Sequence, residues 1–484
     1  MRLKPSIHGR WLIGTLLLTG CAVGPDYKKP DPVLPEKWSL ARAKDTSLQQ
    51  ADEAVLSTWW ESFHDSELSR LIGEGHSQNL DLKIAMTRID SARSEQSANR
   101  AALFPKIGAT ADAARLSNLF PVGLPRGNNI NYFLTGFDAI WEIDVFGRLR
   151  RKLEAAEAQT SASVEEYREA FLMLSAEIGR QYVSYRGLQQ QAEILDQNLK
   201  LLVEISALSE GRYVHGLESR DTVEKYRALA DSTAAELRAT EARITTERHK
   251  IEALIGRKPD ALKVRLGTTN PIPTTSERRL LTQPADTLRL RPDVRSAEFQ
   301  LHSATAIQGA AIAELFPKIS IAAFLGIRNS DLENLFKSSS FAWATGASVT
   351  QPIFNFGQIR AGIDLSDARQ HDAYLQYEKT VLEALHEAET TLSEFVKEEQ
   401  RKTHLVSVVR HLDEASRMAE TRFKEGLGTR QDYLSSLVEA NMERLQLLQS
   451  ETTLATGLIA VFKAIGGAGQ APVELKEDPL RPWG

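Results

Sequence analysis

The residue types that most often carry out chemistry are present in this chain, but their spacing forms no reactive site. Ten histidines are scattered over 484 residues, and none is spaced with a glutamate as metal ligands on a helix are. His404 and His411 lie two helical turns apart, which is more typical of surface positions than of a ligand pair. Five unclustered methionines argue against a methionine path for copper or silver. Without a nucleophile elbow or a phosphate-binding glycine loop, the sequence predicts no enzyme, no cofactor and no metal site.

Cys21 stands out because it is the only cysteine in the chain. A single thiol in an exported protein cannot form an internal disulfide, so a covalent modification would explain it. Residues 1–20 combine basic side chains, a short apolar run and a small-residue end, as a secretory signal peptide does. The sequence Leu18-Thr19-Gly20-Cys21 resembles a bacterial lipobox, whose cysteine becomes the lipidated first residue. We therefore expect acyl chains such as palmitate on Cys21, and Ala22 after it favours sorting to the outer membrane.

The same motifs occur twice along the chain. Leu103-Phe104-Pro105-Lys106-Ile107 recurs letter for letter as Leu315-Phe316-Pro317-Lys318-Ile319, which is 212 residues later. Three later echoes are 210 residues apart: Phe146-Gly147 with Phe356-Gly357, Arg212-Tyr213 with Arg422-Phe423, and Ile255-Gly256 with Ile465-Gly466. Each copy is then one structural unit. The first copy carries two extra residues, which we expect in the glycine- and asparagine-rich segment 120–130, since exposed loops tolerate insertions.

Each copy also contains a long helical pattern. Residues 148–210 contain no proline, and at about 1.5 Å per residue such a helix approaches 95 Å. Residues 358–425 match this pattern in the second copy, and residues 217–255 and 429–465 supply return helices. The sequence therefore predicts two long antiparallel helix hairpins that turn at glycines, as in a coiled coil.

Before each long helix, the spacing of apolar residues changes from the helical period of 3.6 residues to the strand period of 2. Apolar side chains alternate with polar or small ones through residues 132–143, 318–328 and 341–353. This alternation indicates strands with one apolar face. A soluble sheet packed on a core is one interpretation. A lipid-facing exterior around a polar lumen is favoured, because the helices of each copy are committed to their hairpins and leave that face uncovered.

These patterns predict a mainly α protein with a membrane β-barrel and divide the chain into segments. The equatorial region is the level midway along the long helices. The expected segments are a signal peptide (1–20), a lipidated tether with the start of the equatorial region (21–60), a first repeat (61–256, with strands in 105–147 and a helix hairpin in 148–256), an equatorial linker (257–290), a second repeat (291–466, with strands in 317–357 and a hairpin in 358–466), and a tail (467–484).

The order of several short motifs resembles that of the TolC-like outer-membrane factors, in the lipoprotein branch of the OprM and NodT type. The motifs are Cys21 to Tyr27, Trp59-Trp60 with Phe63 and Asp65, both Phe-Pro-Lys-Ile strand starts, Gln351-Pro352-Ile353-Phe354, and both Arg-aromatic-x-x-Gly-Leu turns. The resemblance implies a homotrimer in which four strands per chain close a twelve-stranded barrel, continued by a long antiparallel α-helical barrel. Such a protein is the passive exit duct of a tripartite efflux pump. Its implied partners are a periplasmic adaptor (membrane fusion protein) and an inner-membrane transporter of the resistance-nodulation-division type, which deliver drugs or other small molecules.

The glycine turns are the first candidate functional sites. Gly216-Leu217 and Gly426-Leu427 fall where the two hairpins turn back. Glycine suits any sharp helix end, but an apolar residue at an exposed tip suggests a partner. The resemblance implies that Gly216, Leu217, Gly426 and Leu427 dock the adaptor.

The second tip is also the expected periplasmic gate. The resemblance assigns Arg422, Phe423, Arg430, Asp432 and Ser435 to a constriction held shut by charged and hydrogen-bonded contacts. Many relatives have tyrosine in place of Phe423 and a second aspartate in place of Ser435, so part of that network is missing here. A ring of three Asp432 carboxylates would repel unless protons, cations or arginines relieved it.

Composition leaves one competing interpretation open. A net charge of −5 without a basic patch gives no indication of nucleic-acid binding, so the expected contacts are protein and outer-membrane lipid. A lipid-anchored periplasmic coiled-coil scaffold would use the same long helices without a pore. The alternating strands favour the duct.

Overall fold

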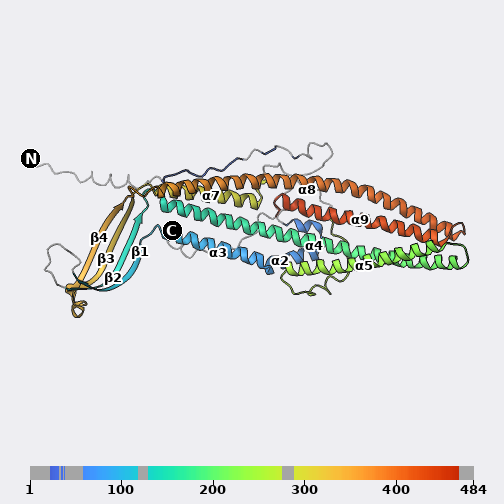
Figure 1. The fold of residues 1–484 in the computed structure, drawn as a ribbon, viewed down its shortest axis with the longest axis horizontal. Coiled ribbons are helices and arrows are strands. Elements are labelled where there is room, and N and C mark those ends of the chain that lie inside the picture. Colours follow the sequence, from blue (N-terminus) through green and yellow to red (C-terminus); the bar gives the residue numbers. More distant parts are fainter. Residues whose placement is uncertain are drawn as a thin grey trace, which may run out of the picture.

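The computed structural model describes residues 22–31, 34–35, 38, 58–117, 129–274 and 288–467. Cys21, the signal segment 1–20, residues 118–128 (which include most of the expected insertion segment 120–130), residues 275–287 of the expected equatorial linker and residues 468–484 of the tail lie outside the described residues. The molecule is elongated, with strands at one end and helix tips at the other (Figure 1).

Two helix hairpins of matching size form most of the length. In the first repeat, α4 (Arg148–Val214) has 67 residues and α5 (Arg220–Leu254) has 35. In the second, α8 (Gln358–Lys424) and α9 (Arg430–Ala464) have the same two lengths. At about 1.5 Å per residue, each long helix extends roughly 100 Å from the sheet to the tips. Within the chain, α4 packs against α9, so the two hairpins lie side by side.

Shorter helices run beside the long ones near the sheet. The second repeat begins with α7 (Pro292–Ala313), which has 22 residues, as does α3 (Leu80–Ala101) in the first. Before α3 lie the short helix η3 (Trp59–Phe63) and α2 (Ser66–Gln78). Helix α4 packs against both α3 and α7, which joins the two repeats.

The sheet has four antiparallel strands in the order β1-β2-β3-β4. The first repeat supplies β1 (Lys106–Ser117) and β2 (Asn129–Ile143), and the second supplies β3 (Lys318–Asn329) and β4 (Phe341–Thr350). Two short helices, η4 (Leu332–Asn334) and η5 (Ser338–Ser340), lie in the β3–β4 connection. Strands β1 and β4 are the edges, each with one hydrogen-bonded neighbour.

The strand register gathers apolar side chains on one face. Phe137 pairs with Leu325, which pairs with Trp343, and these side chains are 64%, 54% and 69% exposed. One position along, on the other face, Asp138 pairs with Phe324. An exposed face of large apolar side chains of this kind suits a lipid exterior.

The main apolar core lies midway along the helices, at the equatorial level. Trp59 is fully buried and stacks on Phe462, with ring centroids 5.5 Å apart. The segment after α5 packs into the same core, because Tyr185 Oη donates to the carbonyl of Leu266 at 2.9 Å. The core thus ties the first helices, both hairpins and the inter-repeat segment together.

The fold class expected from the sequence is confirmed: the protein is mainly helical, with four antiparallel strands continued by long antiparallel helices. Among the described helices, none has a stretch long and apolar enough to cross a membrane.

Candidate functional site

Both hairpin tips are built by the same backbone motif. In the second, the amide of Leu427 donates to the carbonyl of Arg422 at 2.8 Å, and the amide of Gly426 donates to Phe423 at 3.1 Å. The first tip has the equivalent pair of bonds from Leu217 and Gly216. These two bonds define a Schellman C-cap, which needs a left-handed residue. The glycines provide it, with φ of +71° and +72°.

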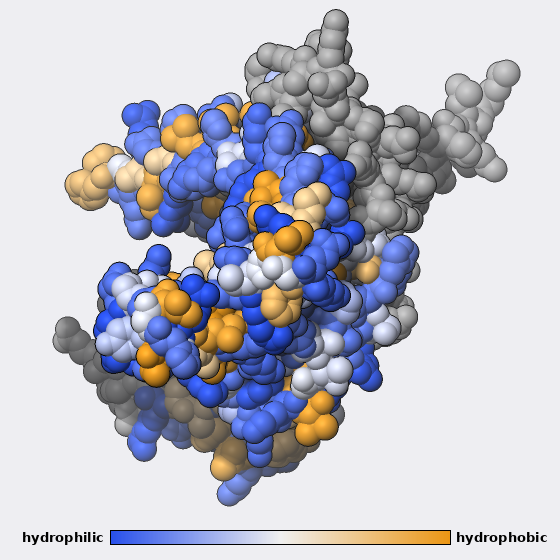
Figure 2. Space-filling model, turned by 90° about the vertical axis from the view of Figure 1, so that its right-hand side faces the viewer, coloured by the Kyte–Doolittle hydropathy of each residue, from blue (hydrophilic) through white to orange (hydrophobic). Residues whose placement is uncertain are grey.

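The leucine after each glycine is displayed to solvent. Leu217 is 68% exposed and Leu427 is 75% exposed. The view onto the tip end shows apolar patches set among hydrophilic side chains (Figure 2). Helix packing within the chain therefore does not use these two side chains.

Asp432 has a structural role at the start of α9. Its Oδ2 accepts from the Thr429 hydroxyl at 2.6 Å and from the Thr429 amide at 3.1 Å, while the Asp432 amide donates to Thr429 Oγ1 at 3.1 Å. This reciprocal pattern is a capping box. The bonds from the Thr429 side chain and backbone, followed by the charges of Arg212 and Arg422, lower the pKa of Asp432.

Polar contacts connect the two tips of one chain. Arg430, the first residue of α9, forms an ion pair and hydrogen bond with Glu204 of α4. Its neighbour Gln431 donates from Nε2 to Glu218 Oε1 at 3.3 Å, and Glu218 lies in the first tip. The guanidinium of Arg212 also lies 3.5 Å from Glu218. We call Arg430, Gln431, Glu204 and Glu218 the tip latch.

The remaining predicted gate residues lie close by, around the turn. Arg422 and Phe423 are in the last turn of α8; Arg422 is exposed and Phe423 is partly buried. Ser435 is partly exposed, one turn after Asp432 on α9. The structure thus brings all five residues to one hairpin end, with Arg430 and Asp432 in side-chain contacts.

Sequence reasoning missed four residues that complete these contacts: Thr429, Gln431, Glu204 and Glu218. Thr429 could have been found, because a threonine three residues before an acidic residue at a helix start indicates a capping box. Glu204 and Glu218 carry no such signal, since their partners depend on how α4 lies against α9.

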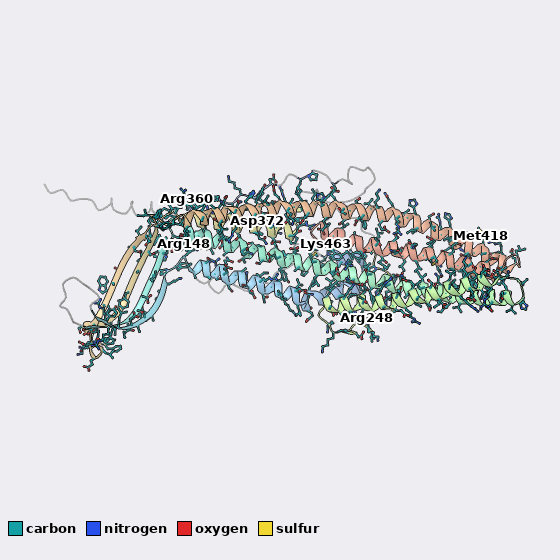
Figure 3. The ribbon with its side chains drawn as sticks, viewed as in Figure 1. Arg148, Arg248, Arg360, Asp372, Met418 and Lys463 are labelled. Atoms are coloured by element: carbon teal, nitrogen blue, oxygen red, sulfur yellow. The ribbon has the colours of Figure 1, made fainter. Side chains whose placement is uncertain are left out.

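The residues after Cys21 form a second site at the opposite end of the helices. The amide of Val23 donates to the carbonyl of Phe146 at 3.1 Å, at the boundary between β2 and α4. Arg151, a buried residue of α4, holds Asp26 with 2.6 Å between Nη2 and Oδ1. Figure 3 places Arg148 and Arg360 at this sheet end of α4 and α8, and Met418 near the tips.

Within the part of the chain that the structure describes, no group of three or more histidine, cysteine, aspartate or glutamate side chains could hold a metal ion.

Comparison with known proteins identifies the family. The model of the outer membrane efflux protein family matches residues 71–257 and 284–467. The solvent efflux pump outer membrane protein SrpC of Pseudomonas putida is 28% identical over 461 residues, which cover 94% of this chain and 97% of that protein. The outer membrane protein OprJ of Pseudomonas aeruginosa is 27% identical, over 96% of each chain.

Solved structures agree with this result. The outer-membrane channel OprN has a TM-score of 0.84 and 30% identity, covering 92% of this chain and 99% of that one. The open state of the Neisseria gonorrhoeae outer membrane channel MtrE has a TM-score of 0.80 and 26% identity, over 93% and 98% of the two chains. With its repeated strand-and-hairpin fold, matched over both repeats, this chain belongs to the outer membrane efflux protein family.

Proposed function

We propose that this protein is the outer-membrane exit duct of a tripartite efflux pump, which passively releases drugs or other small molecules. One observation carries the proposal: a sheet with an exposed apolar face continues directly into helices of 67 residues. Lipid requires that backbone polar groups be paired, so a spanning sheet must close. The helices would carry the same tube roughly 100 Å into the periplasm.

Closing the sheet into a barrel requires more than one chain. The sheet of one chain has four strands, and its two edges leave unpaired backbone groups. Four strands are too few for a barrel with an open lumen. We propose a homotrimer, in which three sheets form one twelve-stranded barrel and three pairs of hairpins form the helical tube.

The lipid anchor has support from the segment after it. Val23 is fastened at the boundary between sheet and helices, which would lie at the inner surface of the outer membrane. Lipid chains on Cys21, two residues before Val23, would then enter the inner leaflet of the outer membrane. Several acyl chains on one residue provide stable anchoring, whereas one chain binds only marginally.

The hairpin tips are the proposed docking points for a periplasmic adaptor, which connects the duct to an inner-membrane transporter of the resistance-nodulation-division type. Leu217 and Leu427 support this role because they are exposed where the chain itself offers no partner. Burying a leucine side chain contributes about 1.5–3 kcal/mol. Such contacts at several tips would position an adaptor ring around the tube.

The gate is proposed at the second tip. The tip latch holds α9 of the second hairpin against α4 of the first through Arg430 and Glu204. An isolated exposed ion pair stabilises by only about 0–1 kcal/mol. A latch of that strength suits a gate, because adaptor binding could release it. Arg422 and Arg212, whose charges lower the pKa of Asp432, would relieve repulsion among three such carboxylates.

Transport in cells tests the proposal. The chain is expressed with its adaptor and transporter in a strain that lacks its own outer-membrane duct, and accumulation of a fluorescent pump substrate is measured. Wild-type protein should lower accumulation. Leu217→Glu/Leu427→Glu should lose this activity with trimers intact, whereas Leu217→Met/Leu427→Met should keep it. Outer-membrane trimers that leave accumulation unchanged would refute the duct, and activity of the glutamate variant would refute tip docking.

A further inference from the structure

The face of the sheet opposite Phe137, Leu325 and Trp343 would line the lumen of the proposed barrel, and we call it the lumenal face. Many of its side chains are small or absent, as at Gly136 and Gly326, which lie opposite each other on β2 and β3. Because strand residues alternate between the two faces, the register assigns every described strand residue to one of them. The few charged side chains on the lumenal face therefore determine the electric field in the lumen.

These charges are balanced. The described strands carry three acidic and three basic side chains on the lumenal face: Asp112, Asp138 and Glu142, with Lys106, Lys318 and Arg328. A row of charged side chains of one sign makes a lumen selective for ions of the other sign. The lumenal face of this chain has no such excess.

Two of the charges lie at the same level near the outer end of the sheet. Asp112 of β1 pairs with Leu134 of β2, and Leu134 pairs in turn with Arg328 of β3. The two charged residues are thus two strands apart, which is about 10 Å. Both side chains are exposed.

Each of these two side chains is held by a neighbour on its own side. Asp112 Oδ2 accepts a hydrogen bond from the Thr110 hydroxyl at 3.2 Å. The guanidinium of Arg328 lies 5.4 Å from the ring centroid of Tyr132. Among the described residues, no ion pair joins Asp112 or Arg328 to another side chain. Both charges are therefore available to solutes in the lumen.

We infer that Asp112 and Arg328 form a ring of six alternating charges in the trimer, which keeps the lumen free of charge selectivity so that cationic, anionic and zwitterionic substrates pass alike. Strands β1 and β3 alternate around a barrel made of three such sheets, with one strand between them. This inference rests on the proposed function, in which three chains close one duct. It adds the charge class of the substrates and the residues that set it.

Duplication of the repeat does not produce this balance. The position equivalent to Asp112 in the second repeat, 212 residues later, is Phe324. The position equivalent to Arg328 in the first repeat is Leu116. Each repeat thus supplies one sign, and loss of either residue would leave a ring of three like charges.

The next level toward the periplasm is balanced as well. Asp138 of β2 pairs with Gly108 of β1, and a Cβ at Gly108 would lie 3.1 Å from Asp138 Oδ1. The carboxylate of Asp138 therefore leans toward β1, where the next lumenal residue is Lys106. One acidic and one basic side chain again lie on neighbouring strands.

At the junction with the helices, opposite charges are in direct contact. Arg148 Nη2 lies 2.8 Å from Glu142 Oε1, and Lys318 Nζ lies 2.6 Å from Glu314 Oε2. Arg148 also approaches Glu314 at 3.6 Å. This level of the lumen thus carries two acidic and two basic side chains, which pair with one another.

The width of the lumen makes the balance important. Twelve strands about 4.8 Å apart and tilted by about 40° place the backbone wall roughly 12 Å from the axis. The screening length is about 10 Å at 0.1 M salt and about 3 Å at 1 M. At 0.1 M, unopposed charges on the wall would therefore act on solutes throughout the lumen, whereas alternating charges cancel within a short distance.

A cysteine that reports on the lumen tests the inference in full-length protein in outer membranes. Ala344 is suitable because it is exposed and pairs with Phe324, which pairs with Asp138 on the lumenal face. Ala344→Cys is treated from outside with two methanethiosulfonates of similar size, one with a trimethylammonium group and one with a sulfonate. The ratio of the cationic to the anionic modification rate is divided by that of free cysteine. Protein without Ala344→Cys measures any reaction at the natural Cys21.

The normalised ratio should be close to one at 0.1 M salt. Asp112→Asn should lower it on the order of threefold, because the remaining guanidiniums repel the cationic reagent. Arg328→Gln should raise it by a similar factor, and the double variant should return it toward one. These differences should fade at 1 M salt. Arg115→Gln is the matched control and should leave the ratio unchanged, because Arg115 lies on β1 but on the face of Phe137.

A normalised ratio far from one with both charges present would overturn the inference. Single variants that leave the ratio unchanged, or shift it in the same direction, would also overturn it, and all these results leave the proposed duct intact. A different failure would overturn both proposals: trimers that survive in detergent but whose Ala344→Cys thiol reacts with neither reagent, since this face would then line no lumen.

Discussion

The two junctions between sheet and helix have the same backbone path but very different surroundings. At the first junction, Phe146 stacks on Phe316, and Ala22 lies against Gly147. At the second, Phe356 is 91% exposed, and nothing lies within 4 Å of the Cβ position of Gly357. The first junction is completed by its own chain. The second is left exposed, with the Phe356 ring beside that of Phe354 at 4.6 Å between centroids.

The starts of the long helices α4 and α8 also differ in how well their own chain completes them. Asp144 caps α4 by accepting from the amides of Leu149 and Arg150 at 3.0 and 2.8 Å. The equivalent position before α8 is Phe354, which has no oxygen to accept these two bonds. The second junction has thus exchanged a local stabilising contact for exposed apolar surface. Duplication alone would leave both junctions equal, and in the proposed homotrimer the exposed second junction would be the one that faces a neighbouring copy.

Among the differences between the two repeats, His76 should have the largest effect on the free energy of unfolding. This residue stacks on Phe171 at 3.7 Å between ring centroids, and burial lowers its pKa from 6.5 to about 4. The equivalent position in the second repeat, 212 residues later, is the buried Leu288. The His76 side chain takes up a proton more readily in the unfolded chain than in the folded one. Its contribution to the free energy of unfolding is therefore fully present above pH 6.5 and is lost as the pH drops toward 4. The loss would reach about 3 kcal/mol.

Denaturant unfolding between pH 7 and 4, followed by tryptophan fluorescence in detergent, measures this loss. His76→Leu supplies the side chain of the second repeat and should flatten the pH dependence relative to wild type. Equal slopes for the two proteins would show that His76 does not carry the effect.

A matched pair of glycine substitutions should have an intermediate effect. Gly147 and Gly357 both have left-handed φ, of +81° and +84°, so alanine would cost each about 1 kcal/mol. Only at Gly147 would the new Cβ also collide with Ala22, at 2.6 Å. Gly147→Ala should therefore release the segment after Cys21 and speed trypsin cleavage after Lys28. Gly357→Ala should leave that cleavage slow, and equal rates would contradict the difference between the junctions.

The smallest expected effect on stability concerns the helix caps at the two hairpin tips. Thr429 caps α9 through its capping box, whereas Ser219 makes no side-chain cap bond to α5. Thr429→Ala should lower the local stability of the second tip by about 1 kcal/mol, with a smaller loss for Ser219→Ala. Hydrogen exchange of amides at the start of α9 and α5 measures both. Similar acceleration in the two variants would mean that the tips are capped alike.

Much of the fold could be predicted because the same sequence patterns occur in both repeats. The motif spacing, the two hairpins and the change to a period of two follow from local patterns, which short-range physics decides. Trp59-Trp60 was identified as a motif, but its place in the core beside Phe462 depends on packing among several helices. The path of residues 22–31 along α4 and α7 likewise depends on distant contacts such as Arg151 with Asp26.

The hairpin tips were located from sequence, but the side-chain contacts there were not. The turn motif indicated Gly426 and Leu427, and the family resemblance assigned Asp432 to a gate. The structure shows that Asp432 bonds to Thr429, so its local role is helix capping. The contact between Arg430 and Glu204 spans 226 positions. Such a pair is set by the axial register of α4 against α9, and no local pattern encodes it.

Conductance across a planar lipid bilayer tests the central claim, a gated duct, most directly. Purified wild-type trimers should insert and show a small conductance, because the proposed gate at the tips would be closed. Arg430→Ala/Asp432→Ala should raise it several-fold, since it removes the tip latch contact to Glu204 and the Asp432 half of the capping box of α9. The matched change at the first tip, Arg220→Ala/Thr222→Ala, should leave the conductance near the wild-type value. Trimers that conduct no ions in any of these forms would contradict the account.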